Sequence, residues 1–469
     1  MSSTLIPLML VLPILSSITG FVFKKRAVTL GLVFSVCFFT LSIVLLYEVS
    51  SGSVQAYSFG AFTPPLGISF LPTSLGSLIL AFSSFVVLIV SIYAAFYLHI
   101  KHSTLFFPLL SFLVLGFVVV YLSRDIFNIY VGLEIVGLSA VGLSVLEAKT
   151  KSIRAAIVYL FATLGASGLY LLGVALIYSR YGLLDMDALS LVIEDDFVTL
   201  CAFTFMVLAF MIKTALFPLS FWLPNAHANA LSPVSALLSG VVIKATFYLL
   251  FLYSSYLFDF EWSIYEILAI LGVVAIFYGG VKALLANDLK LIIAYSTISQ
   301  IGYLFVVFGM FSQLAYLGMV FTLLSHLLAK SGLFLASGVL IKQTKTRSLK
   351  ALKGAISISP ISVFAIGLSS VSLIGLPPSL GFMGKWYYLQ SSFEGGSWIV
   401  FGAVLGGGVL SAIYLFKMLI VFLEKPLEPI IVKPEKACNV AKWSAFSLSF
   451  LSVFAGLFSY YIIDFLGLA

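Results

Sequence analysis

The chain has 469 residues, of which 62% are hydrophobic and 9% are charged, and its mean hydropathy is +1.18. This composition excludes a soluble globular protein and is typical of a polytopic helical membrane protein. The net charge of +7 follows from Lys and Arg in loops between apolar runs, so it does not indicate nucleic-acid binding. The three cysteines are scattered without a CxxC pair, which indicates neither a disulfide framework nor a metal site.

Apolar runs follow one another along the chain with short connections, and they predict a single integral-membrane domain over residues 1–469. The first run precedes its basic cluster, the reverse of the charge order in a secretory signal, so we expect it to remain as a membrane span. The polar loop 51–73 has the alternation of a short external hairpin. We predict fourteen spans, the seventh and twelfth of them broken, near residues 4–23, 27–47, 74–98, 103–122, 125–146, 153–178, 197–217, 233–254, 264–282, 289–310, 314–341, 359–390, 398–422 and 443–466.

Basic residues test this topology, because cytoplasmic loops of membrane proteins are rich in Lys and Arg. If both termini lie outside, only Arg124 and Arg180 fall in outside loops, and the acidic loop 185–196 also faces outside. We therefore predict a multi-pass protein of the cytoplasmic cell membrane with both termini outside. The basic residues of segment 342–357 are most simply interpreted as positive-inside anchors that hold the loop on the cytoplasmic side. The alternative is docking to anionic lipid or to a soluble partner. The residues expected in inside loops are Lys24, Lys25, Arg26, Lys101, Lys149, Lys151, Arg154, Lys282, Lys290, Lys342, Lys345, Arg347, Lys350, Lys353, Lys425, Lys433, Lys436 and Lys442.

Two spans within residues 203–250 each carry a lysine and are separated by a proline-rich break. Lys213 lies in the first span and Lys244 in the second, and the prolines between them forbid one continuous helix. A charge at the bilayer centre costs roughly 2.5–3.5 kcal/mol, so a purely structural span has no reason to carry one. A broken helix beside ionisable residues predicts an ion path, with snorkelling of the lysines to the interface as the alternative.

Glu134 is the one carboxylate inside a predicted span. It lies nine residues past Asp125, or about 14 Å along the helix, which places it near the middle of the membrane. A carboxylate there stays charged only beside a cation, and lysines are the charged partners that the spans offer. We therefore expect Glu134 to pair with a buried lysine.

Further ionisable residues lie in the second half of the chain. His326 and Lys330 are four residues apart and share one face of the eleventh span, either as proton carriers or as a buried polar pair satisfied by a neighbouring helix. Lys385 follows the glycine- and proline-rich break of the twelfth span. Lys417 lies seven residues before Glu424 at the predicted cytoplasmic edge, so snorkelling and a role within the span fit it equally.

The tenth predicted span begins at a favourable site for a carboxylate. Asp288 lies at its N-terminus, where the helix dipole favours negative charge. Hydroxyl and amide side chains follow in the next turns, and they suit a hydrated passage or interhelical hydrogen bonds equally well. These side chains are Ser296, Thr297, Ser299 and Gln300.

Three segments of the chain carry a family resemblance: KTALFPLSFWLPNAHANALSPVSALLSGVVIKA, NDLKLIIAYSTISQIGY and GLPPSLGFMGK. They resemble the proton-conducting, antiporter-like subunits shared by respiratory complex I, membrane-bound hydrogenases with their sulfur-reducing relatives, and multisubunit cation/proton antiporters. The resemblance spans about residues 100–425. The external loop GAFTPPLGI is similar to that of hydrogenase-type and antiporter D-type members. Many relatives carry an aspartate just after this loop, where this chain has Leu71, Pro72, Thr73 and Ser74, so the role of that aspartate does not carry over.

The resemblance implies a fold and a set of residue roles. The fold is a pump module with two inverted five-helix repeats, 101–260 and 261–425, preceded by helices 1–3 in 1–100 and followed by helix 14 in 426–469. The repeat is also suggested by two lysine pairs at nearly constant spacing, Lys213 with Lys385 and Lys244 with Lys417. By the family's pattern, Glu134 and Lys213 form the coupled ion pair, Lys244 is the central relay, Lys385 is near the exit, His326 and Lys330 link the last two, and His227 is near the entrance break.

Chemistry favours protons as the conducted ion. Na+ prefers several oxygen ligands, whereas the spans offer one Glu and several Lys, and a buried lysine can exchange protons. The leading hypothesis is a proton-translocating subunit of a redox-driven complex, joined to other membrane subunits; any iron–sulfur cluster or NiFe centre would belong to those partners, and we expect no cofactor in this chain. The alternative is a subunit of a non-redox Na+(cation)/proton antiporter. A passive scaffold is disfavoured, because buried lysines on separate helices would cost insertion energy without use.

Overall fold

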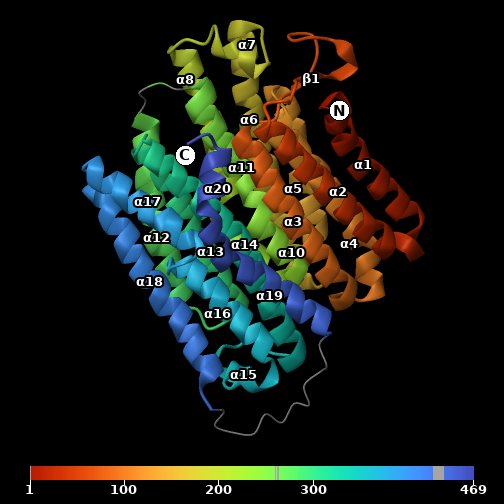
Figure 1. Ribbon diagram of the computed structural model, residues 1–469, viewed down its shortest axis with the longest axis vertical. Coiled ribbons are helices and arrows are strands. Elements are labelled where there is room, and N and C mark those ends of the chain that lie inside the picture. The colour runs from red at the N-terminus through yellow and green to blue at the C-terminus, as the bar shows by residue number, and fades with distance from the viewer. Residues whose placement is uncertain (1, 259, 261–262, 426–437, 469) are drawn as a thin grey trace. The chain divides into compact units, whose positions relative to one another are not determined.

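The computed structural model describes residues 2–258, 260, 263–425 and 438–468 (Figure 1). Within this part of the chain, thirteen helices are long and apolar enough to cross a membrane. The predicted twelfth span consists instead of two shorter helices, α16 (Pro360–Ile374) and α17 (Leu380–Glu394), on either side of the expected break. The prediction of an all-α polytopic membrane protein is therefore confirmed. Lys433 and Lys436, expected in an inside loop, lie outside the described residues.

The first of two units comprises Met1–Ser91, His99–Thr214 and Val242–Trp262. In it α1 packs on α4, α4 on α5, and α6 on α8. Tyr57 pairs with Phe70 in a two-stranded antiparallel ribbon, so the predicted hairpin in the loop 51–73 is confirmed. The elements are α1 (Ser2–Val22), α2 (Ala27–Ser50), β1 (Tyr57–Ser58), β2 (Ser69–Phe70), most of α3 (Ser74–Tyr97), α4 (Ile100–Leu122), α5 (Ile126–Ser144), α6 (Thr150–Tyr181), α7 (Met186–Ser190), α8 (Phe197–Thr214) and α11 (Ile243–Leu252), which continues as a π-helical turn over Tyr253–Leu257.

The second unit comprises Ile92–Leu98, Ala215–Val241 and Ser263–Ala469. Its centre is α14, a helix whose most apolar window is fully buried, and α16, α17 and α19 pack around it. Large apolar side chains on its outer helices stay exposed, such as Ile399 at 75%, as expected of a surface that faces lipid. The elements are α9 (Leu223–Asn229), α10 (Ser232–Leu237) with a π-helical turn over Leu238–Val242, α12 (Ser263–Leu285), α13 (Leu289–Phe305), α14 (Gln313–Thr344), α15 (Ala355–Ile358), α16, α17, α18 (Trp398–Leu423), α19 (Asn439–Phe454) and α20 (Ser459–Phe465).

Aspartates set the starts of two central helices, one in each unit. The Asp125 carboxylate accepts a hydrogen bond from the backbone N–H of Asn128 at 2.6 Å and caps α5. The Asp288 carboxylate accepts from the N–H groups of Lys290 and Leu291 and caps α13. Each cap satisfies backbone donors that have no partner within the helix, so the expected role of Asp288 at a helix N-terminus is confirmed.

The two units repeat the same local construction around these caps. In the first, α6 has 32 residues and ends at the left-handed Gly182, and Asp185 then pairs with Asp125 in an isolated bridge. In the second, α14 also has 32 residues and ends at the left-handed Lys345, and the next bridge pairs with Asp288. Corresponding landmarks differ by the same 163 positions, from 125 to 288, from 182 to 345 and from 185 to 348.

The breaks in the seventh and twelfth spans are also alike in backbone conformation. The α8 helix ends before Ala215, whose φ is +56°, and α16 ends before Gly375, whose φ is +87°. A positive φ ends a right-handed helix, and glycine adopts it without a Cβ clash. These breaks are 160 positions apart, not 172 as the lysine spacing suggested, so Lys213 precedes its break whereas Lys385 follows its own. The lysine pairing used as a sign of the repeat is therefore wrong, because it joins residues on opposite sides of the breaks.

Candidate functional site

Lys213 is held by a hydroxyl on a neighbouring helix. It lies in the last turn of α8, is 8% exposed, and donates a hydrogen bond from Nζ to Thr163 Oγ1 of α6 at 2.9 Å. Glu134 on α5 interacts with it through its charge, yet the described residues contain no direct ion pair between the two. The Oε1 atom of Glu134 is buried there without a hydrogen-bond partner. The two charged groups are thus neighbours that are not in direct contact.

A small cavity lies beside Lys213 in the first unit. It has a volume of about 10 Å³ and is lined by Thr163, Tyr159 and Thr246 together with Leu133 and other residues of α5 next to Glu134. A cavity of about this size holds one water molecule when it offers two or more polar partners. The hydroxyl groups and the ammonium group meet that condition. Glu134 itself does not line this cavity, so the expected contact of Glu134 with Lys213, direct or through one water, stays a prediction.

Lys244 is fully buried on α11, directly after a π-helical turn. Val242 and Thr246 both line the cavity beside Lys213. Because each residue turns a helix by about 100°, Lys244 is about 200° from either neighbour and lies on the other face of α11. Lys213 and Lys244 are therefore separated by the thickness of one helix, and they do not share the cavity.

In the second unit, α14 carries two of the predicted residues at its centre. Lys330 is fully buried, and its Nζ donates to the carbonyl oxygen of Ile293 at 3.1 Å and to Ser296 Oγ, both on α13. His326 lies one turn earlier on α14 and is 1% exposed. The expected common face of His326 and Lys330 follows from their spacing on one continuous helix. Both side chains are buried in the described part of the chain.

Lys385 bridges the break between α16 and α17. Its Nζ donates to the carbonyl oxygens of Leu373 at 3.1 Å and Ile374 at 2.8 Å, and lies 4.6 Å from the centre of the Tyr303 ring. The last carbonyls of a helix have no partner within the helix and carry partial negative charge. Lys385 supplies the missing donor, so the break is what allows this charge to be buried. A Cβ at Gly375 would lie 2.8 Å from Lys385 Cδ, which explains glycine at the turn.

Polar groups on α13 lie between Lys330 and Lys385. Gln300 Nε2 donates to the Leu373 carbonyl oxygen at 3.3 Å, which Lys385 also binds. The Tyr414 hydroxyl of α18 donates to Ser411 at 3.3 Å and lies near Gln300 and Ser296, and Ser296 in turn binds Lys330. Polar side chains therefore lie between the two lysines within the second unit.

The polar side chains of the tenth span serve both roles that the sequence left open, the lining of a passage and hydrogen bonds between helices. Ser296 and Gln300 lie between the lysines. Thr297 bonds to Ser239 at 2.9 Å, and Ser299 donates to the Ile276 carbonyl oxygen at 2.8 Å, so these two join helices. Neighbouring positions on one helix thus serve different purposes, because they face different partners.

His227 lies in the short helix α9 that follows the break in the seventh span. It is fully buried, and its ring stacks on Phe334 with centres 5.5 Å apart. Two cations hold the carbonyls just after it: Lys290 Nζ donates to Ala230 at 2.6 Å, and Arg347 Nη1 donates to Ala228 at 2.6 Å. Lys290 is therefore not the loop residue that the sequence suggested, because it lies in the first turn of α13, is 5% exposed and stabilises the carbonyls that the break frees. The side of the membrane on which it lies stays a prediction.

Comparison with known proteins shows the family to which the chain belongs. A family model described as NADH:quinone oxidoreductase/Mrp antiporter, TM, matches residues 123–411, which is more than half of the chain. The chain belongs to this family. NADH-quinone oxidoreductase subunit N of Desulforudis audaxviator is 30% identical over 387 residues, or 81% of this chain and 77% of that protein. The D-type subunit of the Na(+)/H(+) antiporter of Alkalihalophilus pseudofirmus is 28% identical over 389 residues, or 81% of this chain and 78% of that protein.

Solved structures from both branches of the family share the fold. The membrane-bound sulfane sulfur reductase, an archaeal respiratory membrane complex, contains a chain that matches with a TM-score of 0.91 and 22% identity over 98% of this chain and 96% of that one. A chain of the Mrp complex from a Dietzia species matches with a TM-score of 0.91 and 21% identity over 99% of this chain and 97% of that one. A chain of respiratory complex I from Thermus thermophilus matches with a TM-score of 0.79 and 21% identity over 98% of each chain. At these identities the match shows the fold of this chain.

Lys417 has the contacts of a membrane-edge residue within this family fold. Its Nζ donates to the Leu284 carbonyl oxygen at 2.7 Å, in the last turn of α12, and it is half-buried. Lys353 and Glu424 form an ion pair of 2.8 Å at the same end of α18. A lysine that binds the free carbonyls of a helix end stabilises that end, which corresponds to the interfacial alternative for Lys417.

Four residues of the site were not found from the sequence. Thr163, Tyr303 and Tyr414 carry no charge in apolar helices, and Lys290 follows the Asp288 cap as an ordinary first-turn residue. A hydroxyl within an apolar run is too common to mark a site by itself. The sequence signal that exists is the spacing of Ser296, Gln300 and Tyr303 at three to four residues, which puts them on one face of α13.

Proposed function

We propose that this chain, an antiporter-like subunit of the type found in complex I, the Mrp antiporter and membrane-bound sulfane reductase, translocates protons along Glu134, Lys213, Lys244, His326, Lys330 and Lys385. The observation that carries the proposal is that each half of the chain buries lysines beside hydroxyls, carbonyls or a carboxylate, and the described residues contain no group of three or more His, Cys, Asp or Glu side chains that could hold a metal ion. Such lysines exchange protons, because burial brings their charged and neutral forms close in free energy.

The first unit supplies the proposed switch. Lys213 has two competing partners, the Thr163 hydroxyl that it binds and the Glu134 carboxylate that attracts it through its charge. A change in a neighbouring subunit that moves α5 or α8 would shift Lys213 between them. When Glu134 releases Lys213, the freed positive charge repels a proton held at Lys244, and several kcal/mol of such repulsion arise at low effective dielectric.

The second unit supplies the proposed conduction path. Protons pass from His326 or Lys330 through Ser296, Tyr414 and Gln300 to Lys385, which is held at the break. The proposed order along the whole chain is Lys213, Lys244, His326 or Lys330, and Lys385. His227 and Lys417 have lesser roles in this proposal, at the entrance break and at the membrane edge.

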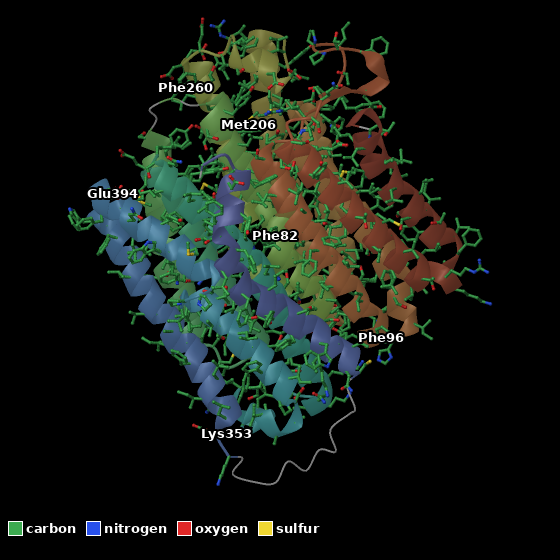
Figure 2. All side chains as sticks on the ribbon, viewed as in Figure 1. Phe82, Phe96, Met206, Phe260, Lys353 and Glu394 are labelled. Carbon is green, nitrogen blue, oxygen red and sulfur yellow. The ribbon has the colours of Figure 1, made fainter. Side chains whose placement is uncertain are left out.

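We propose that repeat one, 101–260, and repeat two, 261–425, are inverted copies. The constant spacing of 163 between the capped starts of α5 and α13 and between the ends of α6 and α14 supports this proposal. Lys353 and Glu394 lie at opposite ends of the second unit (Figure 2), as expected if basic residues face the cytoplasm and acidic residues face outside. We propose that both termini lie outside the cell membrane.

The proposed partners are other membrane subunits, and the driving reaction decides between two complexes. A redox-driven complex of the hydrogenase, sulfane reductase or complex I type would hold its iron–sulfur clusters or NiFe centre in those partners. The second candidate is a Na+/proton antiporter, favoured by the likeness to the D-type antiporter chain. In both cases this chain needs no cofactor of its own for the proton steps.

One experiment tests the function and separates these complexes. The complex is purified in mild detergent with this chain, its subunits are identified, and it is reconstituted in liposomes with a pH-sensitive dye. Proton movement driven by an electron donor, with iron–sulfur subunits present, supports the redox form; proton movement driven only by a Na+ gradient supports the antiporter. Lys213→Ala should abolish either movement while the exposed Lys282→Ala should not, and equal activity of both variants would overturn the proposal.

A further inference from the structure

Arg347 joins two chain segments of the second unit. Its Nε atom lies 3.1 Å from Asp288 Oδ2, while Oδ1 of the same carboxylate caps the start of α13. The backbones of the two segments also pair, because the N–H of Leu289 donates to the Arg347 carbonyl oxygen at 2.8 Å. Since α14 ends at Thr344, Arg347 ties the end of that helix to the start of α13. The proposed proton path does not use this ion pair.

The same guanidinium also binds the end of α9, the short helix that carries His227. Arg347 Nη1 donates to the Ala228 carbonyl oxygen at 2.6 Å. Lys290 Nζ donates to the Ala230 carbonyl oxygen at 2.6 Å. These carbonyls lie at the C-terminal end of α9, where a helix leaves oxygens without a partner and carries partial negative charge. Two cations, one from the start of α13 and one from the segment after α14, therefore clamp the end of α9.

The position of His227 depends on this clamp and on two further contacts. His227 directly precedes Ala228, and its carbonyl oxygen accepts a hydrogen bond from Ser235 Oγ at 2.8 Å. Its buried ring stacks on Phe334 of α14, with 24° between the ring planes. A helix of seven residues is not stable by itself, so the position of α9 depends on what holds its ends. Movement of the Ala228 carbonyl would therefore tilt the ring on Phe334.

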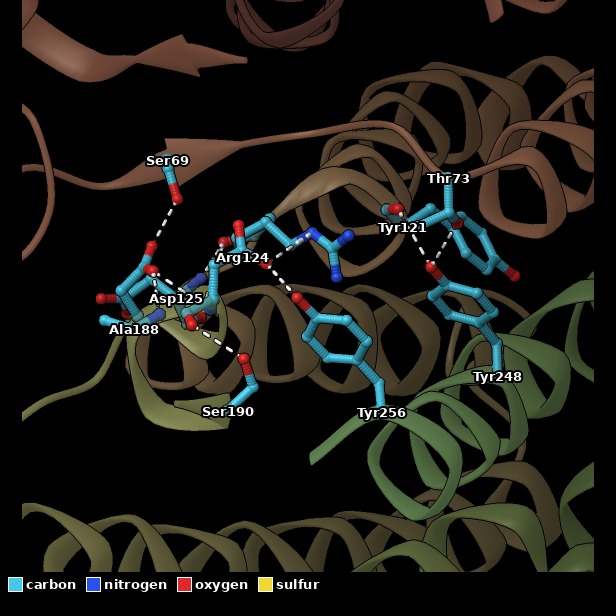
Figure 3. A network of polar contacts seen from close by, with 12 residues as sticks. Ser69, Thr73, Tyr121, Arg124, Asp125, Ala188, Ser190, Tyr248 and Tyr256 are labelled. Carbon is cyan, nitrogen blue, oxygen red and sulfur yellow. Dashed lines mark hydrogen bonds and ion pairs between the residues drawn. The ribbon is translucent and has the colours of Figure 1, made fainter. Parts of the chain in front are cut away.

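The first unit forms the corresponding backbone bridge without a cation on a helix end. There Asp125 pairs with Asp185, and the cation beside the bridge is Arg124. Arg124 Nε lies 3.9 Å from Asp187 Oδ1, and its guanidinium lies 5.0 Å from the centre of the Tyr256 ring (Figure 3). Its Nε and Nη1 atoms make no hydrogen bond among the described residues. The contacts to α9 in the second unit are therefore not a requirement of the bridge.

We propose that Arg347 is a positioning residue for His227, which it holds through the Ala228 carbonyl oxygen while Asp288 anchors the guanidinium. The inference rests on the proposed place of His227 at the entrance of the proton path. A proton passes between groups that lie within hydrogen-bonding distance, so a ring that tilts away from its place transfers protons more slowly. The ion pair itself contributes little to stability, because its side chains are 38% and 23% exposed and water screens their attraction.

Acylation of histidine by diethyl pyrocarbonate tests the position of His227 without a measurement of transport. The reaction at each histidine of the intact complex is followed by mass spectrometry. Arg347→Gln should speed the acylation of His227 roughly tenfold, the fold-change that corresponds to loss of one hydrogen bond from a charged group. His326 is the internal control, because it is buried on the continuous helix α14 and its rate should not change. Lys353→Gln is the matched control, since it breaks a similarly exposed ion pair with Glu424 that does not involve α9.

Proton movement in liposomes then shows whether this position matters for the function. Arg347→Gln should slow turnover-driven translocation to a similar degree, whereas Lys353→Gln should not. Unchanged acylation of His227 in Arg347→Gln, or an equal rise at His326, would overturn the positioning role. Faster acylation of His227 with normal translocation would keep that role and refute the proposed place of His227 in the path.

Asp288→Asn decides if Arg347→Gln does not assemble. Asparagine still caps a helix N-terminus, but it lacks the charge that anchors the guanidinium, so the acylation of His227 should again be faster. An assembled Asp288→Asn complex in which His227 reacts at the wild-type rate would then overturn the positioning role.

Discussion

Thr163→Val removes the hydroxyl that holds Lys213 and keeps the shape of the side chain. A hydrogen bond to a charged group contributes about 1.5–3 kcal/mol. The opposing attraction of Glu134, at a water-bridged separation on the order of 6 Å and an effective dielectric constant of about 20, is about 3 kcal/mol. The two forces on Lys213 are thus of similar size. Loss of the first should shift Lys213 toward Glu134 by a factor of roughly 10 to 150.

The expected result is a complex that assembles normally and translocates protons at a rate lower by tenfold or more, because Lys213 is trapped beside Glu134. The assay is turnover-driven proton movement in liposomes, normalised to the amount of assembled complex. Thr204→Val is the matched control, since Thr204 Oγ1 on the same helix as Lys213 bonds only to the Leu200 carbonyl oxygen within that helix.

A double substitution separates trapping from simple disruption. In a Glu134→Gln background the carboxylate that captures Lys213 is absent, so adding Thr163→Val should change the rate little, and the two effects should be strongly non-additive. If Thr163→Val slows translocation equally with and without Glu134, the competition between the two partners is not the mechanism. Normal translocation by Thr163→Val would refute the reasoning outright.

Three further predictions follow from particular contacts. Lys385→Ala should abolish translocation, whereas Lys417→Ala should retain it and only lower the thermal stability of the purified complex, by the roughly 1 kcal/mol of a helix-end contact. The pKa of Asp196 is lowered to about 2, first by the backbone N–H of the following turn and then by Arg180. A lowered pKa stabilises the folded loop above about pH 4 and this contribution is lost as the pH falls toward 2, so Asp196→Asn should remove acid-induced opening of the loop as followed by limited proteolysis. Lys350→Cys should react with a membrane-impermeant thiol reagent only from the cytoplasmic side and Asp195→Cys only from outside, and the reverse result would invert the topology.

The membrane spans could be predicted from the sequence because the bilayer imposes a length and a composition on each helix. Proline and glycine likewise marked the two breaks, since they remove backbone donors or allow a positive φ, as at Gly375. The expected buried residues Lys213, Lys244, Lys330 and Lys385 are all buried, because a lysine in the middle of an apolar run has no surface to reach within its own unit.

The partners of these lysines could not be predicted, because they come from distant parts of the chain. Thr163 is 50 residues from Lys213, and the Ala230 carbonyl that Lys290 binds is 60 residues away. Nothing local distinguishes Thr163 from the other hydroxyls in the spans. Lys290 was misplaced because its position beside Asp288 resembles a loop, whereas the free carbonyls that attract it exist only once the break at α9 has formed.

The constant spacing of 163 shows how one helical scaffold carries two different chemistries. Position 163 on α6 corresponds to 326 on α14, position 167 to 330, and position 134 on α5 to 297 on α13. In the first unit these positions are Thr163, Ser167 and Glu134, so α6 offers a neutral acceptor, and α5 a carboxylate, to a lysine of α8. In the second they are His326, Lys330 and Thr297, so the proton-carrying groups lie on the central helix itself and the carboxylate is replaced by a hydroxyl that joins helices. Among the residues that the structure describes, the first unit places a carboxylate near a buried lysine of a neighbouring helix, and the second places polar side chains between two buried lysines. In the proposed mechanism, control of the ion therefore belongs to the first unit and its passage to the second, even though both units repeat the same local construction.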